Sequence, residues 1–561
     1  MIQTPPPVLD VRNLWLSFPG HGGDTTAVAG LSFSVRPGQA VALVGESGCG
    51  KSSTALAIMQ LLPDTARFAG EIRLDGRNIV GLPRKELRAM RGSTAAMIFQ
   101  EPMTSLNPVH RIGDQIAEAL RAHEQLSYKA ARARALALLE QVRIPDAARR
   151  LDAYPHQLSG GQRQRVMIAM AISGRPKLLI ADEPTTALDA TIQAQILQLL
   201  DELRQELGMG LLLITHDLAL VSRWTEDVVV MHHGEKMEQL PAVDLFSNAH
   251  HPYTRGLIGA SIRLDRSQHY RKRRLPEIRV VHNPDDTYAF SLEQREPARL
   301  APPLLDSHPV LAVKNLVVRY DTPRGPFTAV DDVSLRIAPG ETLGLVGESG
   351  SGKSTLSKAV MRLVPAHEGR IVFKGEDIGA FSGKDLRRVR RDMQMVFQDP
   401  YGSLNPRHTV GEILEGPLAV HEVDDARERR KRVLDMLDRV GLPARSVNRL
   451  PHEFSGGQRQ RIGIARALIL NPSLVVCDEP VSALDVSVQS QILNLLVELK
   501  ESLNLSYLFI SHDLAVVQYI SDRVVVMKDA KVVEENDHLH IWTNPRHDYT
   551  RALINAVARE Q

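Results

Sequence analysis

Six apolar runs of the chain end in polar motifs, and each run has the length of a buried strand. QAVALVG and ETLGLVG lead into glycine-rich loops, LLIADE and LVVCDE end in acids, and LLLITHD and YLFISHD end in histidine and aspartate. Runs without polar alternation are typical of strands buried on both faces of a parallel sheet. Helical periodicity, as in IQAQILQLLDELRQEL, lies between them. The pattern predicts an α/β fold with a mostly parallel sheet and helices on both faces, with helices beginning at Lys51 and Lys353.

The motifs occur twice in one order. GESGCGKS at Gly45 recurs 302 residues later, the Gln100 motif recurs 298 residues later, and YPHQLSGGQRQR and every later motif recur 296 residues later. A gene duplication with small loop changes explains this drift. We infer two related domains, residues 1–260 and 309–561, joined by a linker at 261–308. The linker contains RKRR at 271–274, which we interpret as a solvated charged face; the alternative is a patch for phosphate or lipid headgroups.

The amino-acid composition excludes several classes of protein. The 561 residues are 43% hydrophobic and 24% charged, as in soluble globular proteins. Lys plus Arg number 68 and Asp plus Glu 66, a net charge of +2 that gives no argument for a nucleic-acid partner. No apolar run approaches the ~20 residues of a membrane-spanning helix, and the first residues lack the pattern of a secretory signal. Two cysteines cannot build a disulfide framework or a four-cysteine metal site. We expect a cytosolic location.

The glycine-rich motifs fit a phosphate-binding loop. GxxxxGK[ST] between a strand and a helix turns backbone N–H groups toward phosphate oxygens, beside the positive end of the helix. The lysine reaches the β- and γ-phosphates and the following hydroxyl binds Mg²⁺. The predicted nucleotide-binding residues are Gly45, Ser47, Gly48, Gly50, Lys51, Ser52 and Ser53 in the first copy and Gly347, Ser349, Gly350, Gly352, Lys353, Ser354 and Thr355 in the second.

Acids and histidines follow the other buried strands. Asp182 and Asp478 are candidate Mg²⁺ ligands, because a buried strand-end carboxylate is costly without a cation. The next residues, Glu183 and Glu479, are placed to polarise an attacking water. The alternative is that these acids only cap the following helices. We interpret His216 and His512, which recur at the same offset, as contacts of the γ-phosphate; the alternative is a structural histidine after a strand.

The SGGQ motifs have the chemistry of a second anion site. Ser159, Gly160, Gly161 and Gln162, and their counterparts Ser455, Gly456, Gly457 and Gln458, offer a hydroxyl and backbone N–H groups at a helix N-terminus. Standing alone, such a motif would be read as a helix cap.

The order of these motifs resembles that of the ATP-binding-cassette ATPases over nearly the whole chain. The resemblance implies ATP and Mg²⁺ as cofactors. It also implies that Gln100 and Gln398 contact the nucleotide and the metal ion, and that Phe18 and Tyr320 each stack on the adenine of one site. It also implies head-to-tail pairing of the two domains, so that Ser455 closes over ATP at Lys51 and Ser159 over ATP at Lys353. Both copies keep their Glu and His, so we expect two hydrolytically competent sites.

SLNP and the HPYTR and HDYTR motifs are similar to those of the group of importers that serves oligopeptides, dipeptides, glutathione and nickel. That resemblance implies two transmembrane permease subunits, an extracytoplasmic solute-binding protein reached indirectly, and a peripheral location on the cytoplasmic face of the bacterial inner membrane. The alternative is a tandem-cassette translation factor acting on the ribosome. That class needs a long charged helical linker and typically lacks the last histidine. A DNA-repair excision ATPase would need zinc modules that two cysteines cannot build.

Cys49 lies inside the first phosphate loop, where the second copy has Ser351. We interpret it as an unreactive small side chain at a variable position. The alternative is a reactive thiolate, because a nearby lysine and a helix N-terminus lower a thiol pKa.

Overall fold

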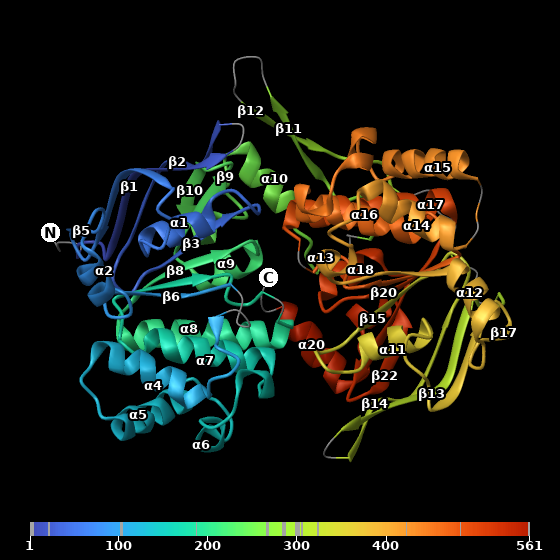
Figure 1. Cartoon of the computed structure of the whole chain (residues 1–561), viewed down its shortest axis with the longest axis horizontal. Coiled ribbons are helices and arrows are strands. Elements are labelled where there is room, and N and C mark those ends of the chain that lie inside the picture. The colour runs from blue at the N-terminus through green and yellow to red at the C-terminus, as the bar shows by residue number, and fades with distance from the viewer. Residues whose placement is uncertain are drawn as a thin grey trace.

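The chain folds into two halves that repeat the same elements in the same order (Figure 1). This computed structural model describes residues 5–558 except 21–22, 101–104, 187, 265–268, 283–287, 298–302, 304–306, 323–324, 422, 424 and 483. No helix among these residues has both the length and the apolar character needed to cross a membrane.

Each half has a six-stranded central sheet. In the first half its order is β10-β9-β3-β8-β7-β6, and in the second β18-β19-β20-β15-β21-β22. The first sheet comprises β3 (Ala40–Gly45), β6 (Ala95–Ile98), β7 (Leu178–Asp182), β8 (Gly210–Thr215), β9 (Asp227–His232) and β10 (Glu235–Pro241). The second comprises β15 (Thr342–Val346), β18 (Met393–Val396), β19 (Leu474–Asp478), β20 (Ser506–Ile510), β21 (Arg523–Lys528) and β22 (Lys531–Asp537). All pairs are parallel except those of the edge strands β10 and β22. The predicted α/β class and its six buried strands are confirmed.

A second, antiparallel sheet in each half was not part of the prediction. It contains β1 (Leu9–Gly20), β2 (Gly23–Val35), β4 (Arg67–Leu74) and β5 (Arg77–Asn78) in the first half. The counterparts are β13 (Leu311–Thr322), β14 (Gly325–Ile337), β16 (Glu368–Phe373) and β17 (Glu376–Asp377). These strands alternate buried and exposed positions only in part, because bulges interrupt their register, for instance between Val11 and Leu14.

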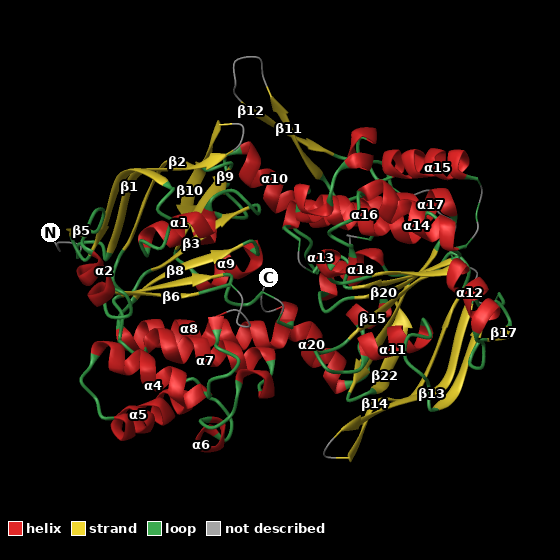
Figure 2. Ribbon diagram, in the orientation of Figure 1, coloured by secondary structure: helices red, strands yellow, loops and turns green. Residues whose placement is uncertain are grey.

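Helices occupy the rest of each half (Figure 2). The first half contains α1 (Lys51–Ile58), α2 (Arg84–Met90), α4 (Ile112–His123), α5 (Tyr128–Gln141), α6 (Ala147–Arg150), α7 (Gly160–Ile172), α8 (Ala190–Leu207), α9 (Leu218–Trp224) and α10 (Pro252–Ala260). The second contains α11 (Lys353–Val360), α12 (Gly383–Asp392), α13 (Pro400–Ser403), α14 (Val410–Val420), α15 (Ala426–Arg439), α16 (Gly456–Leu468), α17 (Val486–Leu503), α18 (Leu514–Ile520), α19 (His540–Thr543) and α20 (Asp548–Ala558). The helices α1 and α11 begin at the predicted lysines.

The halves run in opposite directions in the molecule. Figure 1 shows α4, α5 and α6 at the lower edge of the first half, whereas α14, α15 and α16 lie at the upper edge of the second. The long helices α8 and α17 lie toward the other half, because the C-terminal helix α20 packs on α8 and α10 packs on α17.

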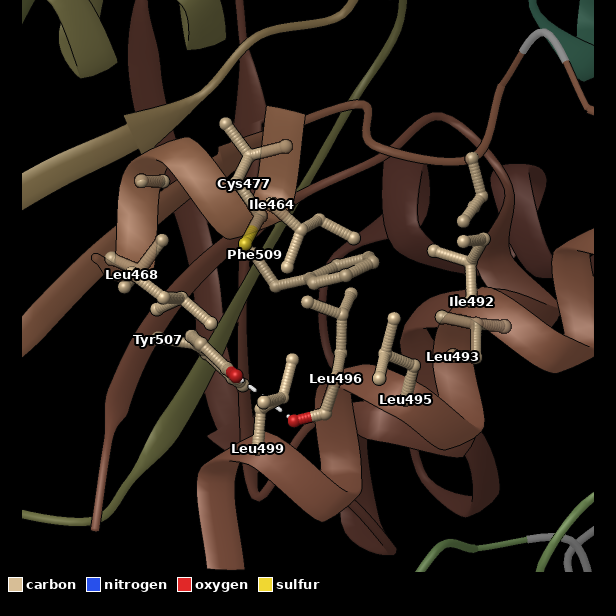
Figure 3. Packing of buried hydrophobic residues seen from close by; sticks show 14 of the residues in the cluster. Ile464, Leu468, Cys477, Ile492, Leu493, Leu495, Leu496, Leu499, Tyr507 and Phe509 are labelled. Atoms are coloured by element: carbon tan, nitrogen blue, oxygen red, sulfur yellow. Dashed lines mark hydrogen bonds between the residues drawn. The ribbon is translucent and has the colours of Figure 1, made fainter. Parts of the chain in front are cut away.

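In the core of the second half, the apolar positions of a helix pack against those of the central sheet. One face of α17 presents Ile492, Leu496 and Leu499 to β19 and β20, where Phe509 is fully buried (Figure 3). The hydroxyl of buried Tyr507 donates to the carbonyl oxygen of Leu496 at 2.9 Å. That bond removes the cost of burying an unpaired hydroxyl, roughly 1–3 kcal/mol.

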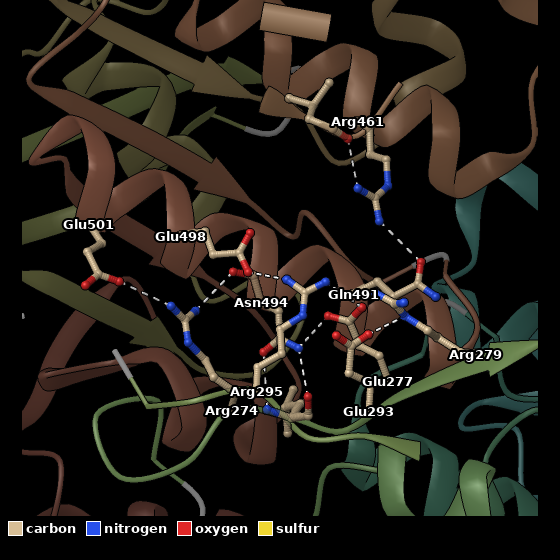
Figure 4. A network of polar contacts seen from close by, with 12 residues as sticks. Arg274, Glu277, Arg279, Glu293, Arg295, Arg461, Gln491, Asn494, Glu498 and Glu501 are labelled. Atoms are coloured by element: carbon tan, nitrogen blue, oxygen red, sulfur yellow. Dashed lines mark hydrogen bonds and ion pairs between the residues drawn. The ribbon is translucent and has the colours of Figure 1, made fainter. Parts of the chain in front are cut away.

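The segment after α10 packs into the second half. Tyr270 is fully buried, and its hydroxyl donates to Asp522 at 2.8 Å and accepts from Lys500 at 3.0 Å. Arg271 pairs with the same Asp522 carboxylate. Arg274, 4% exposed, reaches the backbone oxygen of Asn494 at the edge of a polar network (Figure 4). The interpretation of RKRR as a solvated face is therefore wrong for Arg271 and Arg274. Both side chains contact residues of the second half that are more than 200 positions away, and the local charge pattern gives no sign of such contacts.

A hairpin follows this segment and touches both halves. Its strands β11 (Glu277–His282) and β12 (Tyr288–Glu293) pack on α10, and Phe290 lies against the Tyr253 ring with centroids 5.2 Å apart. On the other side, Glu277 accepts from the amide of Asn494 at 2.8 Å. The region between the motif-bearing halves is thus folded where it is described.

Candidate functional site

The two glycine-rich loops connect β3 to α1 and β15 to α11. Lys51 Nζ donates to the carbonyl oxygens of Gly45 at 2.7 Å and Glu46 at 2.9 Å, and Lys353 makes the equivalent bonds at 2.7 and 2.8 Å. Gly50 and Gly352 cap the helices at φ of 98° and 102°, a conformation that disfavours side chains. A Cβ atom at Gly50 would also lie 2.3 Å from the carbonyl oxygen of Ala27. These contacts give both loops one shape.

The hydroxyl that follows each lysine meets the strand-end aspartate. Ser52 Oγ lies 3.2 Å from Asp182 Oδ1, and Ser354 Oγ lies 3.4 Å from Asp478 Oδ1. Burial raises the pKa of both aspartates, and the serine hydrogen bonds offset only part of that shift. A buried carboxylate beside a hydroxyl is a set of hard oxygen donors, and such a set fits Mg²⁺.

Each glutamate is held by a histidine and a glutamine. His216 Nδ1 lies 3.3 Å from a Glu183 carboxylate oxygen, and Gln100 Nε2 donates to the other oxygen at 2.7 Å. Thr186, which the sequence reasoning missed, also donates to Glu183, at 2.9 Å. Burial favours the neutral acid, but the hydrogen bond and charge of His216 outweigh it and lower the pKa of Glu183 to about 2.

The second half repeats this cluster. His512 lies 3.1 Å from Glu479, and Gln398 donates to Glu479 at 2.7 Å. Both glutamates have left-handed backbone, with φ of 46° and 49°, which is strained for a residue with a side chain. The structure thus brings Gln100 and Gln398 to the glutamates, while Asp182 and Asp478 meet the serines.

The SGGQ motifs begin α7 and α16. Ser159 accepts from Gln162 N at 3.3 Å while the Gln162 side chain accepts from Ser159 N, and Ser455 and Gln458 repeat this capping box. Gly161 is closely packed, since a Cβ there would lie 2.6 Å from Ile192. In the described part of the chain, the side-chain hydroxyls of these two serines bond within their own boxes.

Each phosphate loop makes a polar contact with a residue at the start of a helix of the opposite half, α8 or α17. Asp189 of the first half accepts from Ser349 N in the second phosphate loop, with 3.4 Å between the atoms. Ser487 of the second half donates to the Glu46 carboxylate in the first loop. A cavity of about 230 Å³ is lined by Leu188 and Asp189 together with residues of the second half, which include Lys353, Ser354, Gln398, Glu479 and His512. The second phosphate loop therefore opens onto the first half.

The remaining predicted residues lie outside these clusters. Phe18 is half-buried on β1, and Tyr320, 39% exposed, occupies the same place on β13. Cys49 is 3% exposed, and burial raises its pKa despite the nearby Lys51. These observations favour the interpretation of an unreactive side chain over the reactive thiolate, because loss of water outweighs the positive charge.

Comparison with known families agrees with this arrangement. The model of the ABC transporter family matches residues 28–186 and 330–482, the segments that carry both phosphate loops and both acid pairs. The chain belongs to the ABC transporter family. It is an ATP-binding cassette ATPase with both cassettes in one chain. The model of the oligopeptide/dipeptide transporter C-terminal region matches residues 237–286 and 533–561.

Similar proteins extend over almost the whole chain. The glutathione import ATP-binding protein GsiA of Pectobacterium atrosepticum is 48% identical over 98% of this chain and 89% of its own length. The protein of the same name from Escherichia coli K12 has the same identity and coverage. A solved dimeric ATP-binding cassette with bound ADP and phosphate is 33% identical over 41% of this chain and 98% of its own, with a TM-score of 0.38. The matches to import proteins and to the oligopeptide/dipeptide transporter region give no support to the ribosome-acting alternative.

Proposed function

We propose that this chain is the energy-coupling subunit of a bacterial importer for glutathione or closely related peptides. The observation that carries the proposal is the doubled set of phosphate loop, aspartate, glutamate and histidine in a chain 48% identical to glutathione import proteins over 98% of its length. The two matches to the oligopeptide/dipeptide transporter C-terminal region support the peptide class of solute.

The proposed nucleotide sites use the predicted residues. Lys51 and Lys353 hold the β- and γ-phosphates, and the loop amides surround them. Phe18 and Tyr320 stack on adenine. Ser52 and Asp182, with the carbonyl group of Gln100, would hold Mg²⁺ in the first site, and Ser354, Asp478 and Gln398 would hold it in the second. The ion, when bound, neutralises charge on the phosphate oxygens.

The proposed chemistry uses the glutamates and histidines. Glu183 and Glu479 accept a hydrogen bond from the attacking water and draw its proton toward the carboxylate. His216 and His512 orient these carboxylates and donate toward the γ-phosphate. The serines of the SGGQ motifs, Ser159 and Ser455, close over the nucleotide held by the opposite half.

The proposed setting is the cytoplasmic face of the inner membrane. Two separate transmembrane permease subunits hold the chain there, and an extracytoplasmic protein delivers the solute to them. ATP binding and hydrolysis close and open the two halves and move the permeases between their states. We further propose residues 1–260 and 309–561 as the two nucleotide-binding domains, with 261–308 between them.

Uptake of labelled glutathione tests this proposal. A strain that lacks the chain should lose uptake, and the wild-type chain should restore it. The variant Glu183→Gln/Glu479→Gln keeps the shape of both sites, so purified protein should bind ATP while its hydrolysis falls by about 10²–10⁴-fold. That variant should not restore uptake. Restored uptake, or unchanged hydrolysis, would contradict the assignment; normal uptake of a dipeptide in the deleted strain would show that the solute is glutathione.

A further inference from the structure

Tyr549 of the HDYTR motif touches the second phosphate loop. Its hydroxyl accepts a hydrogen bond from the backbone N–H of Glu348 at 3.0 Å. The side chain lies near the start of α20 and is buried, with 8% exposed. Burial raises the pKa of Tyr549 to about 12, so the hydroxyl is neutral at physiological pH. A neutral hydroxyl can accept this bond through its oxygen throughout the physiological range.

The bonded peptide group belongs to the residue that holds the phosphate-binding lysine. The carbonyl oxygen of Glu348 accepts from Lys353 Nζ at 2.8 Å. The same carbonyl accepts from Ser351 N at 3.2 Å, which closes the turn of the loop. Tyr549 therefore fixes the N–H of Glu348 while the C=O of the same residue orients the lysine.

The adjacent amide of the loop is held by the opposite half. Ser349 N donates to Asp189, which also caps α8 through a bond from Ile192 N at 3.0 Å. The helix α20 that carries Tyr549 packs directly on α8 (Figure 1). Two successive amides of one phosphate loop are thus held by two helices that pack on each other across the interface.

We propose that Tyr549 is a positioning residue of the second nucleotide site, and that its hydroxyl links the shape of the phosphate loop to the packing of α20 on the opposite half. This inference rests on the proposed role of Lys353 in nucleotide binding. It gives the C-terminal motif a function in the ATPase cycle. When one half moves against the other, the displacement of α20 changes the position of Lys353 through Tyr549 and Glu348.

The first half supplies a matched control. Tyr253 is the equivalent residue of the HPYTR motif and is fully buried beside the first loop. Its hydroxyl lies near the backbone of Glu46, but among the described residues it makes no hydrogen bond of ordinary geometry. Removing the Tyr549 hydroxyl breaks the well-formed bond from Glu348 N–H, so it should cost more than removing the Tyr253 hydroxyl.

Nucleotide binding in single-site variants measures the effect. Lys51→Ala leaves the second site and Lys353→Ala leaves the first, and the bound stoichiometry of a fluorescent ATP analogue checks the site assignment separately. In the Lys51→Ala background, Tyr549→Phe should raise the dissociation constant about fivefold, the loss of one net hydrogen bond. In the Lys353→Ala background, Tyr549→Phe should leave it unchanged, and Tyr253→Phe should raise it by less than fivefold. No change in the first background, or equal changes in both, would overturn the proposal.

Hydrogen–deuterium exchange provides a readout without nucleotide. Tyr549→Phe should speed exchange of the amide of Glu348, while the amide of Glu46 keeps its rate in this variant. Unchanged exchange at Glu348 would overturn the proposal. This result does not depend on whether each lysine variant binds ATP at one site.

Discussion

His512 and Glu479 form a contact of 3.1 Å between imidazole Nδ1 and carboxylate oxygen, and His216 and Glu183 repeat it at 3.3 Å in the first half. Burial alone would lower the pKa of each histidine, but the partner carboxylate outweighs it and raises the pKa of His216 and His512. The same interaction lowers the pKa of both glutamates. The two side chains therefore stabilise each other's charged form.

The stability of the pair should depend on pH in a defined window. The histidine contribution is present below its ordinary value of 6.5 and is lost as pH rises through the raised pKa. The contribution of Glu183 is present above its ordinary value of 4.5 and is lost as pH falls toward about 2. We expect full stabilisation between these ordinary values. Glu183→Gln removes the carboxylate, so the pKa of His216 should fall below 6.5 in an NMR titration of ¹³C-labelled histidine. A pKa that stays raised in this variant would contradict the ion pair.

Removing one partner of the buried Lys500–Asp522 pair should destabilise the second half. Lys500 Nζ lies 3.0 Å from Asp522, with the lysine side chain 1% exposed. Lys500→Met leaves a buried carboxylate with less compensation, which costs about 3–5 kcal/mol. Tyr270→Phe should cost about 1 kcal/mol, the net value of a hydrogen bond. Scanning calorimetry should show a lower unfolding temperature for both variants.

Lys272→Met is the matched control for this segment, because Lys272 is exposed two residues after Tyr270. Its unfolding temperature should equal that of the wild type. If Tyr270→Phe also leaves the temperature unchanged, the segment does not contribute to the fold of the second half.

Both cysteines should be unreactive in the native protein. Cys49 is 3% exposed and Cys477 is fully buried, and burial raises both thiol pKa values. Maleimide should label neither at neutral pH until denaturant is added, and Cys49→Ser, the residue type of the second copy, should keep ATP hydrolysis. Rapid labelling of Cys49 that Mg-ATP prevents would restore the reactive-thiolate interpretation.

The local pattern of the sequence predicts the buried strands and the beginning of each catalytic helix. Strands such as β7 and β19 are continuous apolar runs, and α1 and α11 start where a glycine precedes the lysine. The repeat supports the prediction, because two copies of the motifs in one order make chance matches improbable. Within each half, the motifs identified the glutamine and histidine that meet Glu183 or Glu479, but not Thr186.

Contacts over long separations could not be predicted in the same way. Asp189 meets Ser349 across 160 residues, and Tyr270 meets Asp522 across 252. These pairs depend on how the halves pack, and neither periodicity nor motif order encodes that packing. The repeated HPYTR and HDYTR motifs were a signal for Tyr549, but its bond to Glu348 became visible only in the folded chain.

Paired substitutions show whether each ATP site is completed by the opposite half. Lys51→Ala/Ser455→Ala disables one proposed site twice and leaves the other intact. Lys51→Ala/Ser159→Ala disables both, because Ser159 acts on ATP held by Lys353. Steady-state ATP hydrolysis of the purified proteins should be clearly higher in the first double variant than in the second. Equal losses in the two double variants would contradict the head-to-tail account.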